Sequence, residues 1–225
     1  MIDDVADEFR VVGAQLFKGV LLPCMSQLNA ALAGLPTDQA GVRLQGMESL
    51  KTMLVVEGHI GAIASMALGS LARPVRAILF NKTPETNWAL AWHQDRTICV
   101  KERCEVEGFG PWTVKQGMNH VAPPIEILAR MVTIRAHLDD VPATNAPLLI
   151  APGSHVLGMV PVSRVNEIVA DCGTMACLAE AGDLWLYSTP ILHASEAATK
   201  PAKRRVLQVD YAAFDLPGGL EWQGV

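Results

Sequence analysis

The chain has 225 residues, of which 50% are hydrophobic and 18% are charged, and its formal net charge is -5. This composition argues against intrinsic disorder and allows a single domain with a large packed core. The acidic balance argues against a nucleic-acid partner, which would need a basic face, but it leaves room for a small anionic ligand held by one or two arginines.

The cysteines and the N-terminus predict a reducing, cytoplasmic environment. The five cysteines are odd in number and contain no C-x-x-C pair, so we expect reduced and mostly buried thiols rather than a disulfide framework or a zinc site. Cys99 with Cys104, or Cys172 with Cys177, would be the alternative metal pairs, but neither has a histidine at zinc-ligand spacing. The start of the chain is acidic where a signal peptide is basic, and no apolar run is long enough to span a bilayer.

The first third of the chain is predicted to be mainly helical. Acidic residues over 3–9 favour the first turn of a helix, and 14–17 reads as a short strand. Leucines at helical spacing predict a helix from Pro23 that ends before Pro36. A second helical pattern extends over 48–73. Nothing in this part resembles a catalytic cluster.

From Pro74 the pattern changes to short segments that are rich in β-branched and aromatic residues and bracketed by turn signals. The predicted strands cover residues 75–80, 89–92, 97–100, 131–138, 148–150, 175–178, 184–187 and 205–211. About eight such strands favour an antiparallel sandwich or jelly roll of the cupin kind. No linker divides the chain. We therefore predict one domain over 1–225, with a helical part (1–73) that packs on a β core (74–215).

Residues 104–124 interrupt the strands with several glycines and prolines. A loop of this length inside a compact domain is usually functional or mobile. Because it follows the segment described next, we expect it to form a lid over the site.

The most informative stretch is Trp92-His93-Gln94-Asp95. On a strand, successive side chains point to opposite faces, so His93 and Asp95 project together while Gln94 points away. An imidazole and a carboxylate side by side are two adjacent metal ligands, and His193 is the candidate for the third. Two histidines and one carboxylate leave the opposite coordination positions open, which is the arrangement of non-haem Fe(II) oxygenases.

Several further motifs accompany these residues. They are Asn145-Ala146-Pro147-Leu148-Leu149-Ile150-Ala151-Pro152-Gly153-Ser154-His155, Gly182-Asp183, His193-Ala194-Ser195 and Arg204, which is eleven residues after His193. Together with Trp92-His93-Gln94-Asp95, they make the chain resemble the phytanoyl-CoA dioxygenase family of Fe(II)- and 2-oxoglutarate-dependent oxygenases, over roughly residues 74–212. Each motif is weak alone, and the combination is specific.

The resemblance implies a double-stranded β-helix fold with iron bound by His93, Asp95 and His193. It also implies that Arg204 pairs with the distal carboxylate of 2-oxoglutarate, assisted by Ser195. A guanidinium suits this role, because it offers two parallel donors to a carboxylate and stays charged. Arg205 is the alternative, since only one of the two arginines can face inwards on a strand.

Other polar and aromatic positions have ordinary structural readings. His155 is assigned to a turn or the rim of the site, whereas His120 and Trp112 in the expected lid are candidates for contact with substrate or cosubstrate. Arg96, Lys101 and Arg103 are the only basic cluster suited to phosphates, and neighbouring glutamates favour a solvated face instead.

The expected function is therefore a dioxygenase that uses Fe(II), 2-oxoglutarate and O₂ to hydroxylate a small organic substrate and releases succinate. By the same resemblance, the presence of Asp95 favours hydroxylation, because related halogenases lack this carboxylate so that chloride can bind. The alternative is a cupin-like protein that binds a metal or a small acid without turnover. The substrate and the oligomeric state cannot be read from the sequence.

Overall fold

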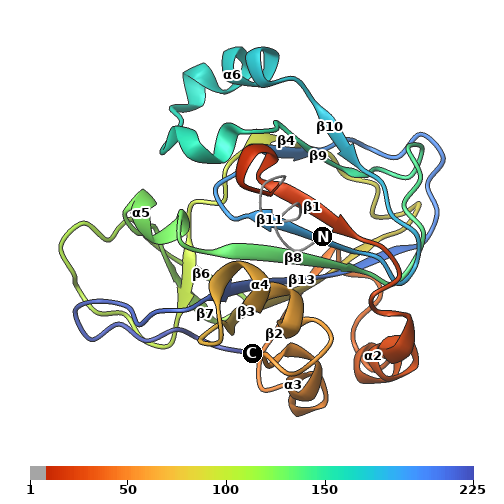
Figure 1. The fold of residues 1–225 in the computed structure, drawn as a ribbon, viewed down its shortest axis with the longest axis horizontal. Helices are drawn as coiled ribbons and strands as arrows, with labels where there is room; N and C mark the ends of the chain where they lie inside the picture. Colours follow the sequence, from red (N-terminus) through yellow and green to blue (C-terminus); the bar gives the residue numbers. More distant parts are fainter. Residues whose placement is uncertain (1–8) are drawn as a thin grey trace.

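The structure of the protein is a computed structural model that describes residues 9–225 (Figure 1). The helix start expected from Asp3 lies outside the described residues. The strand expected at 14–17 is present as β1 (Ala14–Phe17), and the leucine-spaced helix is present as α2 (Met25–Leu32). The helix follows the helical spacing of its leucines.

The strands form three antiparallel sheets, and this confirms the predicted jelly-roll fold with N-terminal helices. The large sheet has the order β1-β11-β8-β13-β3-β2, with β11 Leu184–Ser188, β8 Val132–His137, β13 Arg204–Ala212, β3 Arg73–Lys82 and β2 Gly41–Leu44. The small sheet has the order β10-β9-β12-β4, with β10 Met175–Cys177, β9 Leu148–Ile150, β12 His193–Ser195 and β4 Leu90–His93. The third sheet has the order β5-β7-β6, with β5 Ile98–Val100, β7 Met118–Val121 and β6 Trp112–Lys115.

The two faces of the large sheet differ in chemistry because side chains alternate along each strand. On the outer face, Leu79 of β3 and Leu207 of β13 join the main hydrophobic core with the N-terminal helices. Figure 1 shows these helices on the side of the large sheet that is turned away from β4 and β9. The inner face carries polar residues instead, such as Arg76 of β3 and Arg135 of β8. The site therefore forms between the two sheets.

The single helix expected over 48–73 is wrong. The structure has two helices there, α3 (Glu48–Leu54) and α4 (Gly61–Leu68), joined by a tight connection. A Cβ atom at Gly58 would lie 2.3 Å from the carbonyl oxygen of Thr52, and one at Gly61 would lie 2.1 Å from that of Val55. Only glycine allows this close approach of backbone to backbone, so these two residues mark the break. Strand β2 was also not predicted.

The prediction of a loop over 104–124 is also wrong in its second half. Residues 112–121 form the β6–β7 hairpin, which pairs with β5 as the third sheet. The remaining helices are α5 (Ile125–Leu128), α6 (Val165–Cys172) and three short 3-10 segments, Leu22–Cys24, Ser154–Leu157 and Val162–Arg164. A regular hairpin, rather than an irregular lid, thus borders the site.

The cysteines behave as predicted. All five are free thiols, and Cys24, Cys99 and Cys177 are buried. Within residues 9–225, the helices are too short or too polar to cross a bilayer.

Candidate metal centre

The structure brings His93, Asp95 and His193 together although Asp95 and His193 are 98 positions apart in the sequence. Each can offer one ligand atom, and these atoms all lie within 4.8 Å of one another. Elsewhere in residues 9–225, no group of three or more His, Cys, Asp or Glu side chains converges in this way. Two imidazoles and one carboxylate fit Fe(II), because this donor set leaves positions open for other ligands.

Strand pairing positions the two histidines. In the small sheet His193 of β12 is directly opposite His93 of β4, and the two rings are 4.3 Å apart between centroids. In each ring Nδ1 is within hydrogen-bond distance of a carbonyl two residues earlier, Ala91 O at 2.7 Å and Ile191 O at 2.9 Å. A proton on Nδ1 that is donated to this carbonyl leaves the lone pair on Nε2 free for a metal. Burial also lowers the pKa of His193 to about 4, so this imidazole is neutral at pH 7.

Asp95 lies two residues beyond the end of β4, so the strand alone does not hold it. Its neighbour Gln94 points away from the site, as expected, and anchors this segment. The amide of Gln94 donates to Gly158 O and to Pro190 O, both at 2.9 Å, and its oxygen accepts from the backbone N–H of Val160 at 2.9 Å. A buried amide with this many partners fixes the backbone on both sides of it.

Arg76 of β3 forms an ion pair with the carboxylate of Asp95. Its Nη2 is 3.4 Å from Asp95 Oδ2, and its Nε donates to Asp210 Oδ2 at 2.5 Å. Thr133 donates to the other oxygen of Asp210 at 3.1 Å. Burial opposes ionisation of Asp95, but Arg76 and the two histidines outweigh it and hold the pKa of Asp95 below its ordinary value. The carboxylate is therefore charged at neutral pH, as a metal ligand must be.

We expect Arg76→Gln to destabilise the protein by about 3–5 kcal/mol, because it leaves Asp210 buried without its charged partner. Arg73→Gln is the matched control on the same strand, since Arg73 pairs with Asp215 at the surface and an exposed pair contributes at most about 1 kcal/mol. Urea unfolding of both variants measures the difference. Equal losses in the two variants would contradict a structural role for the Arg76 pair.

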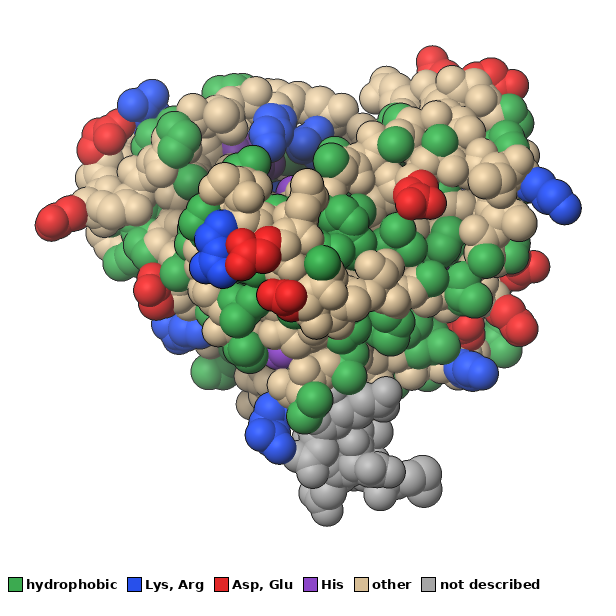
Figure 2. All heavy atoms as spheres, turned by 90° about the horizontal axis from the view of Figure 1, so that it is seen from above, with side chains coloured by type: hydrophobic (Ala, Val, Ile, Leu, Met, Phe, Trp, Pro, Cys, Tyr) green, Lys and Arg blue, Asp and Glu red, His purple; other side chains and the backbone are tan. Residues whose placement is uncertain are grey.

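The three metal-ligating candidates open into a cavity of about 170 Å³ between the sheets. It is lined by Arg43, Arg76, Ile78, Phe80, Trp88, Leu90, His93, Asp95, Thr97, Lys115, Arg135, Leu148, His193, Ala194, Ser195, Arg204 and Gln208. Five of these side chains are cationic, and Asp95 is the one carboxylate among them. In Figure 2, histidine side chains are visible inside a hollow of the surface, next to side chains of lysine or arginine. The cavity thus suits an anionic ligand.

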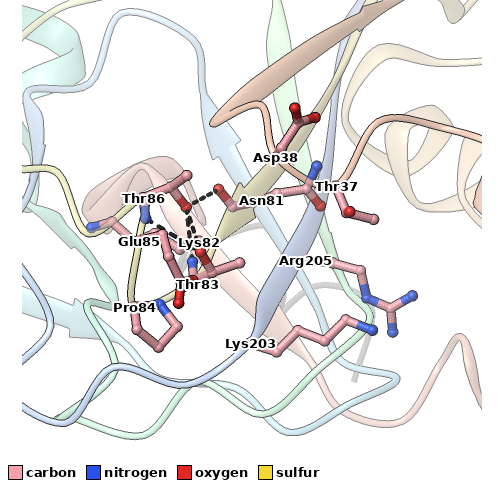
Figure 3. A pocket seen from close by; sticks show the side chains of 10 residues that line it. All are labelled: Thr37, Asp38, Asn81, Lys82, Thr83, Pro84, Glu85, Thr86, Lys203 and Arg205. Atoms are coloured by element: carbon pink, nitrogen blue, oxygen red, sulfur yellow. Dashed lines mark hydrogen bonds between the residues drawn. The ribbon is translucent and has the colours of Figure 1, made fainter.

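Arg204, rather than Arg205, faces this cavity. Alternation along β13 turns Arg205 to the opposite face, where it binds both oxygens of Asp139 at 2.8 and 2.9 Å. There Arg205 and Lys203 border a separate hollow of about 560 Å³ (Figure 3), which contains no metal-binding group of side chains. Arg204 is 2% exposed, its Nη1 donates to the carbonyl oxygen of Ala146, and its Nε has no partner among the described residues.

Two cations that sequence reasoning missed accompany Arg204. Lys82 is opposite Arg204 in the β13–β3 pairing, and its Nζ donates to Ser195 Oγ at 3.2 Å and to Glu196 O at 2.8 Å. Arg135 of β8 donates to the side-chain oxygen of Gln208 at 2.9 Å. Burial and then the charge of Arg135 lower the pKa of Arg204 to about 9. No carboxylate is among the groups that shift this pKa, so Arg204 lies among cations. The sequence could have indicated the position of Arg135, because this residue lies between the apolar Ile134 and Ala136 on a predicted strand. Its side chain must then point to the face opposite the apolar core.

The other candidates from the sequence do not line the cavity. Trp112 packs in a separate hydrophobic cluster, and His120 is fully buried. His155 lies in the turn where it was assigned, with its ring beside Gly13. Lys101 and Arg103 form ion pairs with Glu221 and Glu105 on the surface, as the solvated-face interpretation predicts.

Comparison with known proteins places the chain in a family. Residues 47–206, well over half of the chain, match the family described as phytanoyl-CoA dioxygenase (PhyH). No curated protein matches the chain.

Among solved structures, the chain is similar to SnoN, a non-heme alpha-ketoglutarate-dependent epimerase from nogalamycin biosynthesis, with 18% identity, a TM-score of 0.66, and coverage of 97% of this chain and 90% of that one. It is similar to EctD from S. alaskensis with bound Fe, with 17% identity, a TM-score of 0.64 and coverage of 92% and 75%. It is also similar to HygX from Streptomyces hygroscopicus with nickel and 2-oxoglutarate bound, with 15% identity, a TM-score of 0.64 and coverage of 93% and 86%. At these identities the likeness shows a shared fold.

The family match confirms the predicted resemblance and, with it, the expected cofactors. The chain belongs to the phytanoyl-CoA dioxygenase family of Fe(II)- and 2-oxoglutarate-dependent enzymes.

Proposed function

We propose that the protein is a dioxygenase that hydroxylates a small organic substrate and converts 2-oxoglutarate and O₂ to succinate and CO₂. One oxygen atom enters the substrate and the other enters succinate. The observation that carries the proposal is the convergence of His93, Asp95 and His193 in the same cavity as Arg204, whose guanidinium has no carboxylate partner among the described residues. EctD with bound Fe and HygX with nickel and 2-oxoglutarate share this fold, which supports the same use of the site here.

In this proposal His93, Asp95 and His193 would hold the metal. When bound, Fe(II) together with 2-oxoglutarate and O₂ supplies the oxidant that attacks a substrate C–H bond. The chain's own task is to place the reacting carbon and to keep the ligands in their charge states. Arg76 keeps Asp95 ionised. The carbonyl oxygens that pair with the two Nδ1 atoms keep the histidines neutral, with Nε2 free for the metal.

Arg204 would bind the distal carboxylate of 2-oxoglutarate, with Ser195 as a second donor. The Ser195 hydroxyl accepts a hydrogen bond from Lys82, and its own hydrogen makes only a long contact with Glu196 O, at 3.5 Å. A rotation of the hydroxyl would let it donate to a carboxylate oxygen instead. Lys82 is itself held over the Trp88 ring, 4.8 Å from the centroid. We therefore include Lys82 as a positioning residue for the cosubstrate.

The affinity for 2-oxoglutarate should fall as the pH rises above about 8. Burial, then Arg204 and Arg135, lower the pKa of Lys82 to about 8, and only the protonated form attracts an anion. Lys82→Met should weaken binding at pH 7 and remove the decline that begins near pH 8, because the cation that titrates there is gone. Calorimetric titration of the Ni(II)-loaded protein with 2-oxoglutarate at each pH measures this. Lys203→Met, at an exposed lysine that does not line the metal-bearing cavity, should keep the wild-type profile.

A turnover experiment tests the function itself. The protein is incubated in air with Fe(II), 2-oxoglutarate and pooled metabolites, and succinate release is followed together with the masses of the products. Hydroxylation predicts a substrate-dependent rise in succinate and a product heavier by one oxygen atom. SnoN is an epimerase, so a product of unchanged mass would indicate epimerisation instead. Metal and 2-oxoglutarate binding without succinate under any condition would indicate the cupin-like binding protein.

A further inference from the structure

Two of the cations that line the cavity lack a bonded partner in the described part of the chain. Arg43 of β2 and Lys115 of β6 line the same cavity as His93. Within residues 9–225 neither side chain makes an ion pair or a hydrogen bond, and the Nε of Arg43 is buried without a partner. By contrast, Arg76 in the same cavity is paired with two carboxylates. An unpaired buried guanidinium atom is costly unless a ligand satisfies it.

The fold brings these two cations together by a specific contact. The side chain of Gln116, at the tip of the β6–β7 hairpin, binds the edge of β2. Its oxygen accepts from the backbone N–H of Arg43 at 3.0 Å, and its nitrogen donates to Gly41 O at 3.1 Å. Gln116 and Gly117 have φ of 50° and 79°, the left-handed pair that a two-residue hairpin turn requires. The turn therefore sets Lys115 beside Arg43.

Other cations of the cavity act on both residues. Burial and then Arg76 lower the pKa of Arg43. Burial, then Arg43 and Arg76, lower the pKa of Lys115, and the attraction of Asp95 offsets this only in part. Like charges held this close oppose each other, and an anion between them would relieve the repulsion.

This pair is separate from the proposed cosubstrate position. Strand pairing places Arg135, Gln208, Ile78 and Arg43 in one row across the inner face of β8, β13, β3 and β2. Three strand spacings of roughly 4.8 Å put the backbones of Arg135 and Arg43 about 14 Å apart. A 2-oxoglutarate molecule held by Arg204 and Ser195, on the Arg135 side of this row, would therefore leave Arg43 and Lys115 free for a second ligand.

The size of the cavity is consistent with a second ligand at its mouth. Its volume of about 170 Å³ is below the roughly 300–1,000 Å³ of pockets that enclose a drug-sized ligand. A substrate would therefore insert its reacting end and leave the rest at the mouth, where Lys115 is exposed. Ile78, between Gln208 and Arg43 in the row, offers an apolar contact along the way.

We propose that the primary substrate carries an anionic group, a carboxylate, phosphate or sulfonate, that Arg43 and Lys115 bind at the mouth of the cavity. That Arg43 and Lys115 bind an anion follows from these two side chains alone. That the anion belongs to the primary substrate rests on the proposed function. A guanidinium and an ammonium together suit such a group, because one gives paired donors and the other a mobile charge.

The first test uses sulfate as the probe, since it is a simple dianion. Sulfate is titrated calorimetrically into the Ni(II)-loaded protein with and without saturating 2-oxoglutarate, with chloride at equal ionic strength as the reference. We expect a sulfate site that persists with 2-oxoglutarate bound and is weakened at least tenfold in the double variant Arg43→Gln/Lys115→Gln. The control Lys101→Gln/Arg103→Gln removes the same charge from surface ion pairs and should bind sulfate as the wild type does. Equal affinity in the wild type and the first double variant, or no sulfate site with 2-oxoglutarate bound, would overturn the proposal.

The second test identifies the charge of the substrate. A metabolite extract is separated on an anion exchanger at pH 8, and each fraction is assayed for stimulation of succinate release. The stimulating compound should be in the retained fraction, and the Arg43→Gln/Lys115→Gln variant should lose the stimulation while it keeps the wild-type affinity for 2-oxoglutarate. Stimulation by the unretained fraction alone would disprove an anionic substrate. If no fraction yields succinate, the oxygenase proposal fails, and the sulfate titration still decides whether Arg43 and Lys115 form an anion site.

Discussion

Asp95→Ala and His193→Ala should each lose metal binding while the fold survives. Each variant removes one of three proposed ligands, and two ligands on one face cannot hold Fe(II) against water and buffer. Changes of residues that merely support a metal ligand already cost about 10- to 100-fold in affinity, so we expect a loss of at least about 100-fold here. Titration of the metal-free protein with Fe(II) under anaerobic conditions, together with 2-oxoglutarate, measures it through the visible charge-transfer band of the complex.

The matched control for this experiment is His59→Ala. His59 is exposed and lies far along the chain from the cluster, so its loss should leave both the band and the metal affinity unchanged. Removal of His193 takes away a neutral buried ring, and thermal unfolding separates any resulting loss of packing from loss of metal. Full metal affinity or full succinate release in Asp95→Ala or His193→Ala would remove that residue from the site.

Arg204→Ala should weaken 2-oxoglutarate binding by about 30- to 4,000-fold. Truncating one partner of a buried charge pair costs about 2–5 kcal/mol, and each 1.4 kcal/mol is tenfold in affinity. The fold should tolerate the change, because Arg204 has no carboxylate partner in the described residues and is repelled by Arg135. Calorimetric titration of the Ni(II)-loaded variant with 2-oxoglutarate measures the loss.

Arg205→Ala is the adjacent control on the same strand. Arg205 binds Asp139 and Asn29 on the opposite face, so its removal should lower the unfolding free energy by about 1.5–3 kcal/mol and leave the affinity for 2-oxoglutarate as it is. The reverse pattern, normal affinity in Arg204→Ala and weak affinity in Arg205→Ala, would transfer the cosubstrate role to Arg205.

Local patterns in the sequence predicted much of the β core. Segments such as 148–150 and 184–187 carry the alternation or apolar runs of buried strands, and the structure has β9 and β11 there. The error over 48–73 arose because the periodicity of apolar residues continues through Gly58 and Gly61, although the backbones of two helices meet there. The β6–β7 hairpin was not predicted because it is stabilised by pairing with β5. Nothing in the glycine- and proline-rich sequence of this segment indicates that contact.

The sequence by itself determined the family, the jelly-roll class and the candidate triad, because residue types at a fixed spacing around His93, His193 and Arg204 carry that information. Tertiary structure decided what surrounds them. Strand pairing brings Lys82 beside Arg204, and Gln116 brings Lys115 beside Arg43, from positions far apart in the chain. Which side of a strand faces the cavity depends on register, and register is set by contacts between strands rather than within one.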